Sequence, residues 1–247
     1  MNKKEYHLQE LKKIKDWKPY LLKESQLPGR RANLELLQAV VDLGDEKLFN
    51  ELRRYDARRA PTNSPYEFLA MCGVVGLGKF IVEGKEKYFN ELRSYAADSR
   101  WRIREGVAFA LQIIGNKNPK KLLEEMEEWK KGNPYEKRAV AAGLCEPGML
   151  KEKWFIKRVL GILDTITSSI QRIKDRQDEG FRVLRKGLGY CWSVAVAAYP
   201  QEGKRFMEKW IMNKDQDIEW IMKENLKKNR LQKMDSRWVA GMKANLD

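Results

Sequence analysis

The stretch that decides the fold class is YFNELRSYAADSRWRIREGVAFALQIIG, residues 88–115. Its opening octet repeats an earlier stretch, LFNELRRY at residues 48–55, and both copies are followed by a loop and a long apolar helical pattern. The stretches 121–145 and 202–228 show the same order of an amphipathic segment, a turn and a second amphipathic segment. Self-similarity at a spacing of about 34 to 47 residues is typical of stacked helix pairs. The sequence therefore predicts repeated units of helix, short turn and helix.

The unit boundaries carry helix-capping chemistry. Ser64-Pro65-Tyr66-Glu67 has a serine at the cap, a proline at the first helical position and a glutamate in the first turn. The stretch 133–136, NPYE, repeats this device. No stretch shows sustained period-two alternation or a hairpin signal. We therefore expect an all-α fold, in which neighbouring pairs stack because one pair cannot bury its own apolar face.

We expect a single α-solenoid domain over residues 1–247. It comprises an N-terminal helix within residues 1–25, helix pairs over residues 27–231 and a C-terminal capping helix in residues 235–247. The expected helices span residues 2–25, 29–44, 46–55, 64–82, 85–97, 99–115, 119–131, 134–145, 149–174, 178–199, 200–213, 216–229 and 235–245.

The charge balance favours an anionic partner. Lysine and arginine number 49 against 35 acidic residues, which gives a formal net charge of +14. Such a surface attracts nucleic acid or an acidic protein. The alternative is that the lysines only keep the protein soluble. The longest apolar run starts at Phe68, is interrupted by Lys79 and reads as too short to cross a bilayer, so no membrane partner is expected.

The residue inventory excludes several kinds of chemistry. His7 is the only histidine, and the three cysteines lie far apart without a C-x-x-C pair. The sequence therefore predicts no disulfide framework, zinc site, catalytic residue or cofactor, and a cytoplasmic location. Any enzymatic activity would have to use carboxylates, lysine, tyrosine or arginine. These absences favour a binding protein without settling whether it also catalyses a reaction.

Trp101 and Arg104 are the first candidate ligand-binding residues. In the expected helix 99–115 they lie opposite an apolar stripe that runs from Ile103 to Ile114. Arginine binds phosphate and tryptophan stacks on bases, so this face could contact nucleic acid. The alternative is that both side chains pack against the neighbouring repeat.

A second candidate face lies in the late helix 216–229. Trp220, Lys223, Lys227 and Arg230 share one side, and the basic run continues to Lys233. Aligned cations of this kind can form a phosphate track. The alternative is a solvated terminal face.

Arg185 and Lys186 are the last candidates. They lie near the start of the apolar helix 178–199. Gly187 and Gly189 follow them and predict close packing of a neighbouring helix, because no strand precedes them as a nucleotide-binding loop requires.

The stretch 98–115 resembles the second helix of a HEAT repeat. The match runs through Asp98, Ile103, Arg104, Val107, Ala108, Ala110, Leu111 and Ile114. A looser match without the arginine starts at Asp215. The resemblance covers about Leu27 to Leu231 and implies a right-handed superhelical stack whose concave face binds a partner. It also implies that Arg104 can bridge neighbouring repeats.

The chain is also similar in size, charge and architecture to the bacterial alkylpurine DNA glycosylases, which are built from HEAT-like helix pairs. That resemblance implies a damaged base held by tryptophans, arginines and an aspartate. Trp101 with Arg104, and Trp192 near Arg185, are loosely similar to that arrangement. The family's aspartate has no counterpart in the right region. Three functions stay open: a scaffold for an anionic partner, a base-repair glycosylase and a protein-assembly scaffold.

Overall fold

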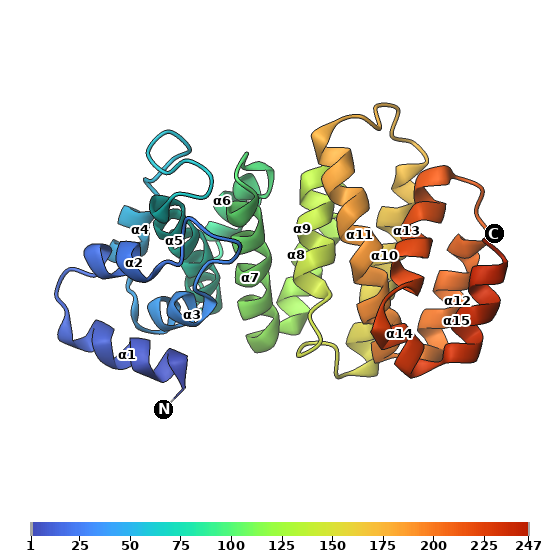
Figure 1. Ribbon diagram of the computed structural model, residues 1–247, viewed down its shortest axis with the longest axis horizontal. Helices are drawn as coiled ribbons and strands as arrows, with labels where there is room; N and C mark the ends of the chain where they lie inside the picture. Colours follow the sequence, from blue (N-terminus) through green and yellow to red (C-terminus); the bar gives the residue numbers. More distant parts are fainter. Residues whose placement is uncertain (1, 247) are drawn as a thin grey trace. The chain divides into compact units, whose positions relative to one another are not determined.

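The computed structural model describes residues 2–246, and every regular element in that range is helical (Figure 1). The expected all-α class is confirmed. The chain divides into two compact units, Met1–Ile114 and Gly115–Asp247, and each has its own buried apolar core. The expectation of one continuous domain stays a prediction.

The first unit is organised around its longest helix, α5. Helix α5 packs against α2, α3, α4 and α6. A Cβ atom on Gly78 would lie 2.7 Å from the backbone oxygen of Ala110, so α5 and α7 also approach closely. The elements are α1 (Lys3–Lys13), α2 (Lys18–Glu24), α3 (Leu34–Leu43), α4 (Glu46–Leu52), α5 (Pro65–Val82), α6 (Tyr88–Ser94), the 3-10 helix η1 (Tyr95–Ala97) and α7 (Trp101–Lys117), which continues past Ile114.

Helix α5 is the one described helix that is both long and apolar enough to cross a membrane, because it combines 18 residues with a mean hydropathy of 1.4. The expectation that this run is too short therefore fails on length. However, 78% of the helix is buried inside the protein, as in the core helix of a soluble fold. The Lys79 amino group donates to the carbonyls of Asp42 and Gly44, at the end of α3. A core position thus accounts for its composition.

The N-terminal segment forms two helices instead of the single one expected. Helix α1 ends at Lys13, and α2 begins at Lys18 with Pro19 in its first turn. Proline is accommodated there because first-turn N–H groups have no intrahelical partner. The Trp17 indole N–H donates to the carbonyls of Leu11 and Ile14, at the end of α1 where carbonyls lack the usual helical partner.

The caps read from the sequence are confirmed. The Ser64 hydroxyl accepts a hydrogen bond from the Glu67 N–H at 3.3 Å, and α5 starts at Pro65. Asn133 likewise accepts from the Glu136 N–H at 3.0 Å. Local sequence chemistry therefore sets these two helix starts.

The second unit is built from successive helix pairs. Helix α11 packs against both α9 and α13, and α10 contacts α8 and α12, so the first and second helices of the pairs form two layers (Figure 1). The elements are α8 (Pro119–Trp129), α9 (Pro134–Leu144), α10 (Lys153–Ile170), α11 (Glu179–Ala198), α12 (Pro200–Ile211), α13 (Gln216–Leu226), α14 (Asn229–Met234) and α15 (Ser236–Ala244).

The expected helix 216–229 is shorter in the structure. Helix α13 ends at Leu226, and Lys228 has an extended backbone before α14 begins at Asn229. The buried side chain of Leu231 anchors α14. The basic run therefore turns a corner and does not continue along one helix face.

Candidate functional site

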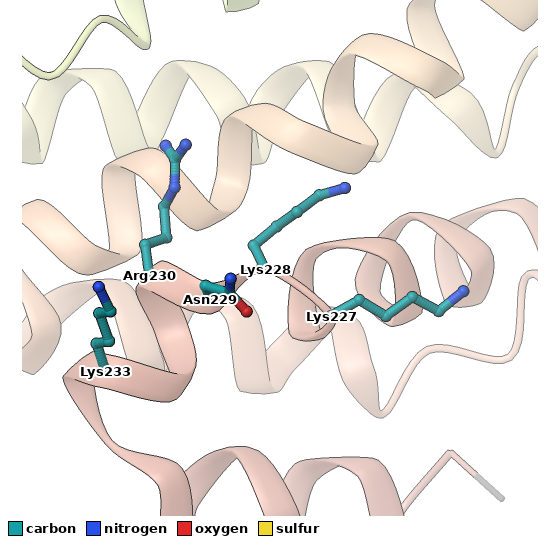
Figure 2. Close-up of a pocket in the computed structure, with 5 residues that line it drawn as sticks. All are labelled: Lys227, Lys228, Asn229, Arg230 and Lys233. Atoms are coloured by element: carbon teal, nitrogen blue, oxygen red, sulfur yellow. The ribbon is translucent and has the colours of Figure 1, made fainter.

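The turn between α13 and α14 forms a basic recess of about 450 Å³. Four of its five lining residues are cationic and none is acidic; they are Lys227, Lys228, Asn229, Arg230 and Lys233. Figure 2 shows the basic side chains fanning out from the turn. The change of direction after Leu226 is what gathers them, because a single straight helix would distribute these positions around its axis. We call these five residues the basic recess.

One carboxylate lies beside the basic recess. The Glu224 carboxylate forms ion pairs with Lys227 Nζ at 2.5 Å and with Lys228 Nζ at 4.0 Å. The hydrogen bond from Lys227 lowers the pKa of this carboxyl group. Exposed ion pairs of this kind contribute little and exchange readily with other anions. Lys233 has no side-chain partner within residues 2–246. The recess thus keeps a net positive charge that a ligand can neutralise.

An exposed tyrosine extends the recess onto α11. Tyr190 is 46% exposed, and its hydroxyl accepts a hydrogen bond of 2.5 Å from Arg230. The Arg230 guanidinium lies 4.6 Å from the centre of the Tyr190 ring, and Lys228 Nζ lies 5.9 Å from it. Sequence reasoning missed Tyr190. The sequence feature that could have identified Tyr190 is its position one helical turn after Lys186, which puts both residues on the same face of α11.

Arg185 and Trp220 take part in a structural network between α11 and α13. The Arg185 guanidinium lies 3.8 Å from the centre of the Trp220 ring, and its Nε forms an ion pair of 2.7 Å with Asp217. Asp217 also pairs with Arg176 at 2.7 Å. A Cβ atom on Gly189 would lie 3.1 Å from Trp220 Cζ3, which confirms the predicted close helix packing. Both candidates already have intramolecular partners.

The remaining second-unit candidates face solvent to different degrees. Lys186 is exposed and has no side-chain partner in the described chain. Lys223 forms an ion pair of 2.7 Å with Glu219. Lys227 lines the basic recess. The structure thus brings Lys227 together with Arg230, which the sequence placed on the same face, and with Lys228 and Lys233 of the same basic run.

Trp101 and Arg104 have opposite environments. Trp101, the first residue of α7, is 42% exposed, and the Arg102 guanidinium lies 4.3 Å from its ring centre. Arg104 is buried and donates to the carbonyls of Asp98 at 2.7 Å and Ser99 at 3.2 Å. Arg104 therefore holds the loop that precedes α7, while Trp101 is accessible to a ligand.

Two further groups of residues are enclosed by the core. Trp192 is fully buried, and its indole N–H donates to Thr167 Oγ1 at 3.0 Å. Cys72, Cys145 and Cys191 are also buried, and burial raises the pKa of the Cys72 and Cys145 thiols. Within residues 2–246 no cluster of three His, Cys, Asp or Glu side chains is arranged to hold a metal ion.

No protein family, curated protein or solved structure matches this chain. The geometry and charge of its surfaces are therefore the features that point to a function.

Proposed function

We propose that this protein is a HEAT-like helical-repeat scaffold that binds a polyanion, with nucleic acid as the favoured partner. The observation that carries the proposal is the basic recess, which is lined by four cations and no carboxylate. Lysine and arginine bind nucleic acid by neutralising phosphates and releasing condensed counterions. The mechanism is binding without chemical change of the ligand.

The layering of the second unit supports the repeat-scaffold part of the proposal. Helix α11 lies between α9 and α13 in one layer, and α10 lies between α8 and α12 in the other. Stacked helix pairs in an α-solenoid have this neighbour pattern. The layer that contains α11 carries Lys186 and Tyr190, and Tyr190 lies next to the turn that forms the basic recess.

A base-repair glycosylase is a weaker candidate. Of the residues that supported that resemblance, Trp192 and Arg104 are buried and bonded inside the protein. Arg185 is paired with Asp217 and Trp220. Only Trp101 is accessible to a base.

The proposal is tested by removing cations from the basic recess. We expect Lys228→Ala/Lys233→Ala to weaken binding of a labelled oligonucleotide and to reduce the slope of log affinity against log salt by about one per lysine. Fluorescence anisotropy across a salt series measures both quantities. Lys120→Ala/Lys151→Ala is the matched control, because both lysines are exposed in the same unit and neither lines the recess.

The outcomes separate the partners. No oligonucleotide binding at low salt, or equal losses in the two double variants, contradicts the proposal. Salt-dependent binding of polyglutamate without binding of oligonucleotide identifies an acidic protein as the partner instead.

A further inference from the structure

The first unit carries a separate surface of unpaired arginines. It lies on two loops, residues 25–33 and 53–64. Its five arginine side chains are exposed, and none makes a hydrogen bond or an ion pair within residues 2–246; they are Arg30, Arg31, Arg54, Arg58 and Arg59. We call this set the arginine surface. Guanidinium groups without a protein partner are available for bidentate contacts with phosphates.

Buried Arg100 holds the longer loop in place. It is 3% exposed, and its guanidinium donates to the carboxylate of Asp98 and to the carbonyls of Tyr55 at 2.9 Å and Ala60 at 3.2 Å. These bonds fix the loop to the start of α7. The arginines of this loop, Arg54, Arg58 and Arg59, therefore extend from a backbone that is held by hydrogen bonds.

Arg102 joins the other loop to the same end of the unit. Its guanidinium donates to the Gly29 carbonyl at 2.6 Å and pairs with Glu67 at 3.1 Å. The Gly29 N–H donates to Asn63 Oδ1 at 3.0 Å, which links the two loops directly. Because the same guanidinium lies against the Trp101 ring, both loops and Trp101 share one end of the first unit.

Aromatic rings accompany the arginines. Trp101 is 42% exposed and Tyr66 is 44% exposed. Tyr66 stacks on Tyr55, with ring centres 5.9 Å apart and an interplanar angle of 26°. Tyr66 directly precedes Glu67, the ion-pair partner of Arg102, so it lies at the same end as Trp101. Two exposed aromatic faces are thus placed beside the arginine surface.

A recess of about 220 Å³ lies within this surface. Its lining consists of Glu51, Arg54, Tyr55 and Arg59. The Glu51 carboxylate is ion-paired with Lys18 at 2.6 Å, which neutralises the only acid in the lining. The recess therefore presents two available guanidinium groups beside an aromatic ring.

We infer that this end of the first unit binds single-stranded nucleic acid, with the arginine surface on the phosphates and Trp101 and Tyr66 stacked on unpaired bases. Bases stack on aromatic side chains whatever their sequence, and a single strand exposes those faces whereas a duplex hides them. Charge alone would suit any polyanion; the exposed rings favour a ligand that carries bases. The inference does not depend on the basic recess of the second unit.

The test compares ligands with and without bases. The 247-residue chain carrying Lys228→Ala/Lys233→Ala is titrated with labelled oligothymidylate and oligouridylate of about 12 nucleotides, and with inorganic polyphosphate as competitor. We expect Arg58→Ala/Arg59→Ala to weaken binding of all three roughly tenfold at low salt. Lys12→Ala/Lys15→Ala removes the same charge from two exposed positions, one in the last turn of α1 and one just after it, and should change little.

Trp101 variants test the stacking contact. Trp101→Leu should weaken oligonucleotide binding roughly tenfold and leave polyphosphate binding unchanged, since only the bases contact the ring. Trp101→Phe keeps an aromatic face and should restore most of the affinity. Thermal unfolding of each variant establishes that the compared proteins are folded.

Binding of either oligonucleotide, with the expected losses in Arg58→Ala/Arg59→Ala and in Trp101→Leu, supports the inference. A preference for oligouridylate or for oligothymidylate identifies the ligand as RNA or as DNA. The inference is overturned if Arg58→Ala/Arg59→Ala behaves like the control Lys12→Ala/Lys15→Ala. Equal effects of Trp101→Leu on oligonucleotide and polyphosphate, or tighter binding of duplex than of single strand, would also overturn it. So would arginine-dependent binding to phosphatidylserine vesicles without oligonucleotide binding. Because Lys228 and Lys233 of the basic recess are already replaced in every protein compared, failure of the recess proposal leaves these comparisons unchanged.

Discussion

His7 is a buried residue whose protonation state is set by its neighbours. Asn33 Nδ2 donates to His7 Nε2 at 3.2 Å, so the other ring nitrogen carries the proton and donates to the Tyr20 hydroxyl at 2.8 Å. The Asn33 amide cannot flip freely, because Nδ2 also donates to the Glu24 carbonyl at 2.9 Å. Burial lowers the pKa of His7, partly opposed by the charge of Glu24. The fold therefore favours the neutral imidazole.

A pH dependence of stability follows. Because the pKa of His7 is lower in the folded state than its ordinary value of 6.5, the unfolded state takes up the proton first as pH falls. The contribution of neutral His7 to stability is complete above that value and is lost as pH falls toward the folded-state pKa. We expect the free energy of unfolding to decrease as pH falls through 6.5, and His7→Gln to flatten this slope. Urea unfolding at several pH values measures it; identical slopes would contradict the assignment.

At the scale of elements, glycines decide how closely helices approach. A Cβ atom on Gly78 of α5 would lie 2.7 Å from the backbone oxygen and 2.9 Å from the Cα of Ala110 in α7. Backbone atoms cannot move aside as a flexible side chain can. Gly161, within α10, has nothing within 4 Å of the corresponding position. Gly78 and Gly161 are therefore suited to a comparison, because both lie inside helices and only Gly78 is closely packed.

We expect opposite effects when each is replaced by alanine. Gly78→Ala should lower the free energy of unfolding by about 1–3 kcal/mol, because overpacking pushes α5 and α7 apart. Gly161→Ala should raise it by about 0.5–1 kcal/mol, because alanine loses less backbone entropy in a helix. Urea unfolding measures both changes. A stable Gly78→Ala protein would show that the two helices can separate without cost.

Helix starts were more predictable than helix breaks. The starts at Pro65 and Pro134 follow from caps within the same few residues. The break near residues 14–17 was missed although Pro19 lies close by, and the corner after Leu226 has no glycine or proline to mark it. The Trp17 indole and the buried Leu231 side chain stabilise these breaks through contacts that a periodicity pattern does not encode.

At the scale of the whole molecule, the net charge of +14 does not by itself locate a binding surface. Many cations are neutralised by acids distant in sequence, as Arg185 is by Asp217. The basic recess has four cations with Glu224 beside it, and the five guanidinium groups of the arginine surface make no ion pair within residues 2–246. Affinity for a polyanion should therefore follow the position of the charge and not only its total.

This can be checked with the double variants that remove two positive charges each. We expect affinity of the otherwise wild-type chain for a single-stranded oligonucleotide to fall in Lys228→Ala/Lys233→Ala and in Arg58→Ala/Arg59→Ala, with a salt slope reduced by about 0.7 per lost phosphate contact. Lys12→Ala/Lys15→Ala should match wild type in both affinity and slope. Equal losses in all three proteins would mean that net charge alone drives binding.

The sequence by itself determined the helical class, most helix starts and the excess of basic residues, because capping, periodicity and composition are local properties. Only the tertiary structure decided which side chains are available to a ligand. Trp101 is exposed and Trp192 is buried; Arg104 is bonded to backbone carbonyls, whereas Arg58 is unpaired within residues 2–246. Residues of the same type differ in this way because burial and ion pairing depend on partners brought together by packing, often from distant parts of the chain.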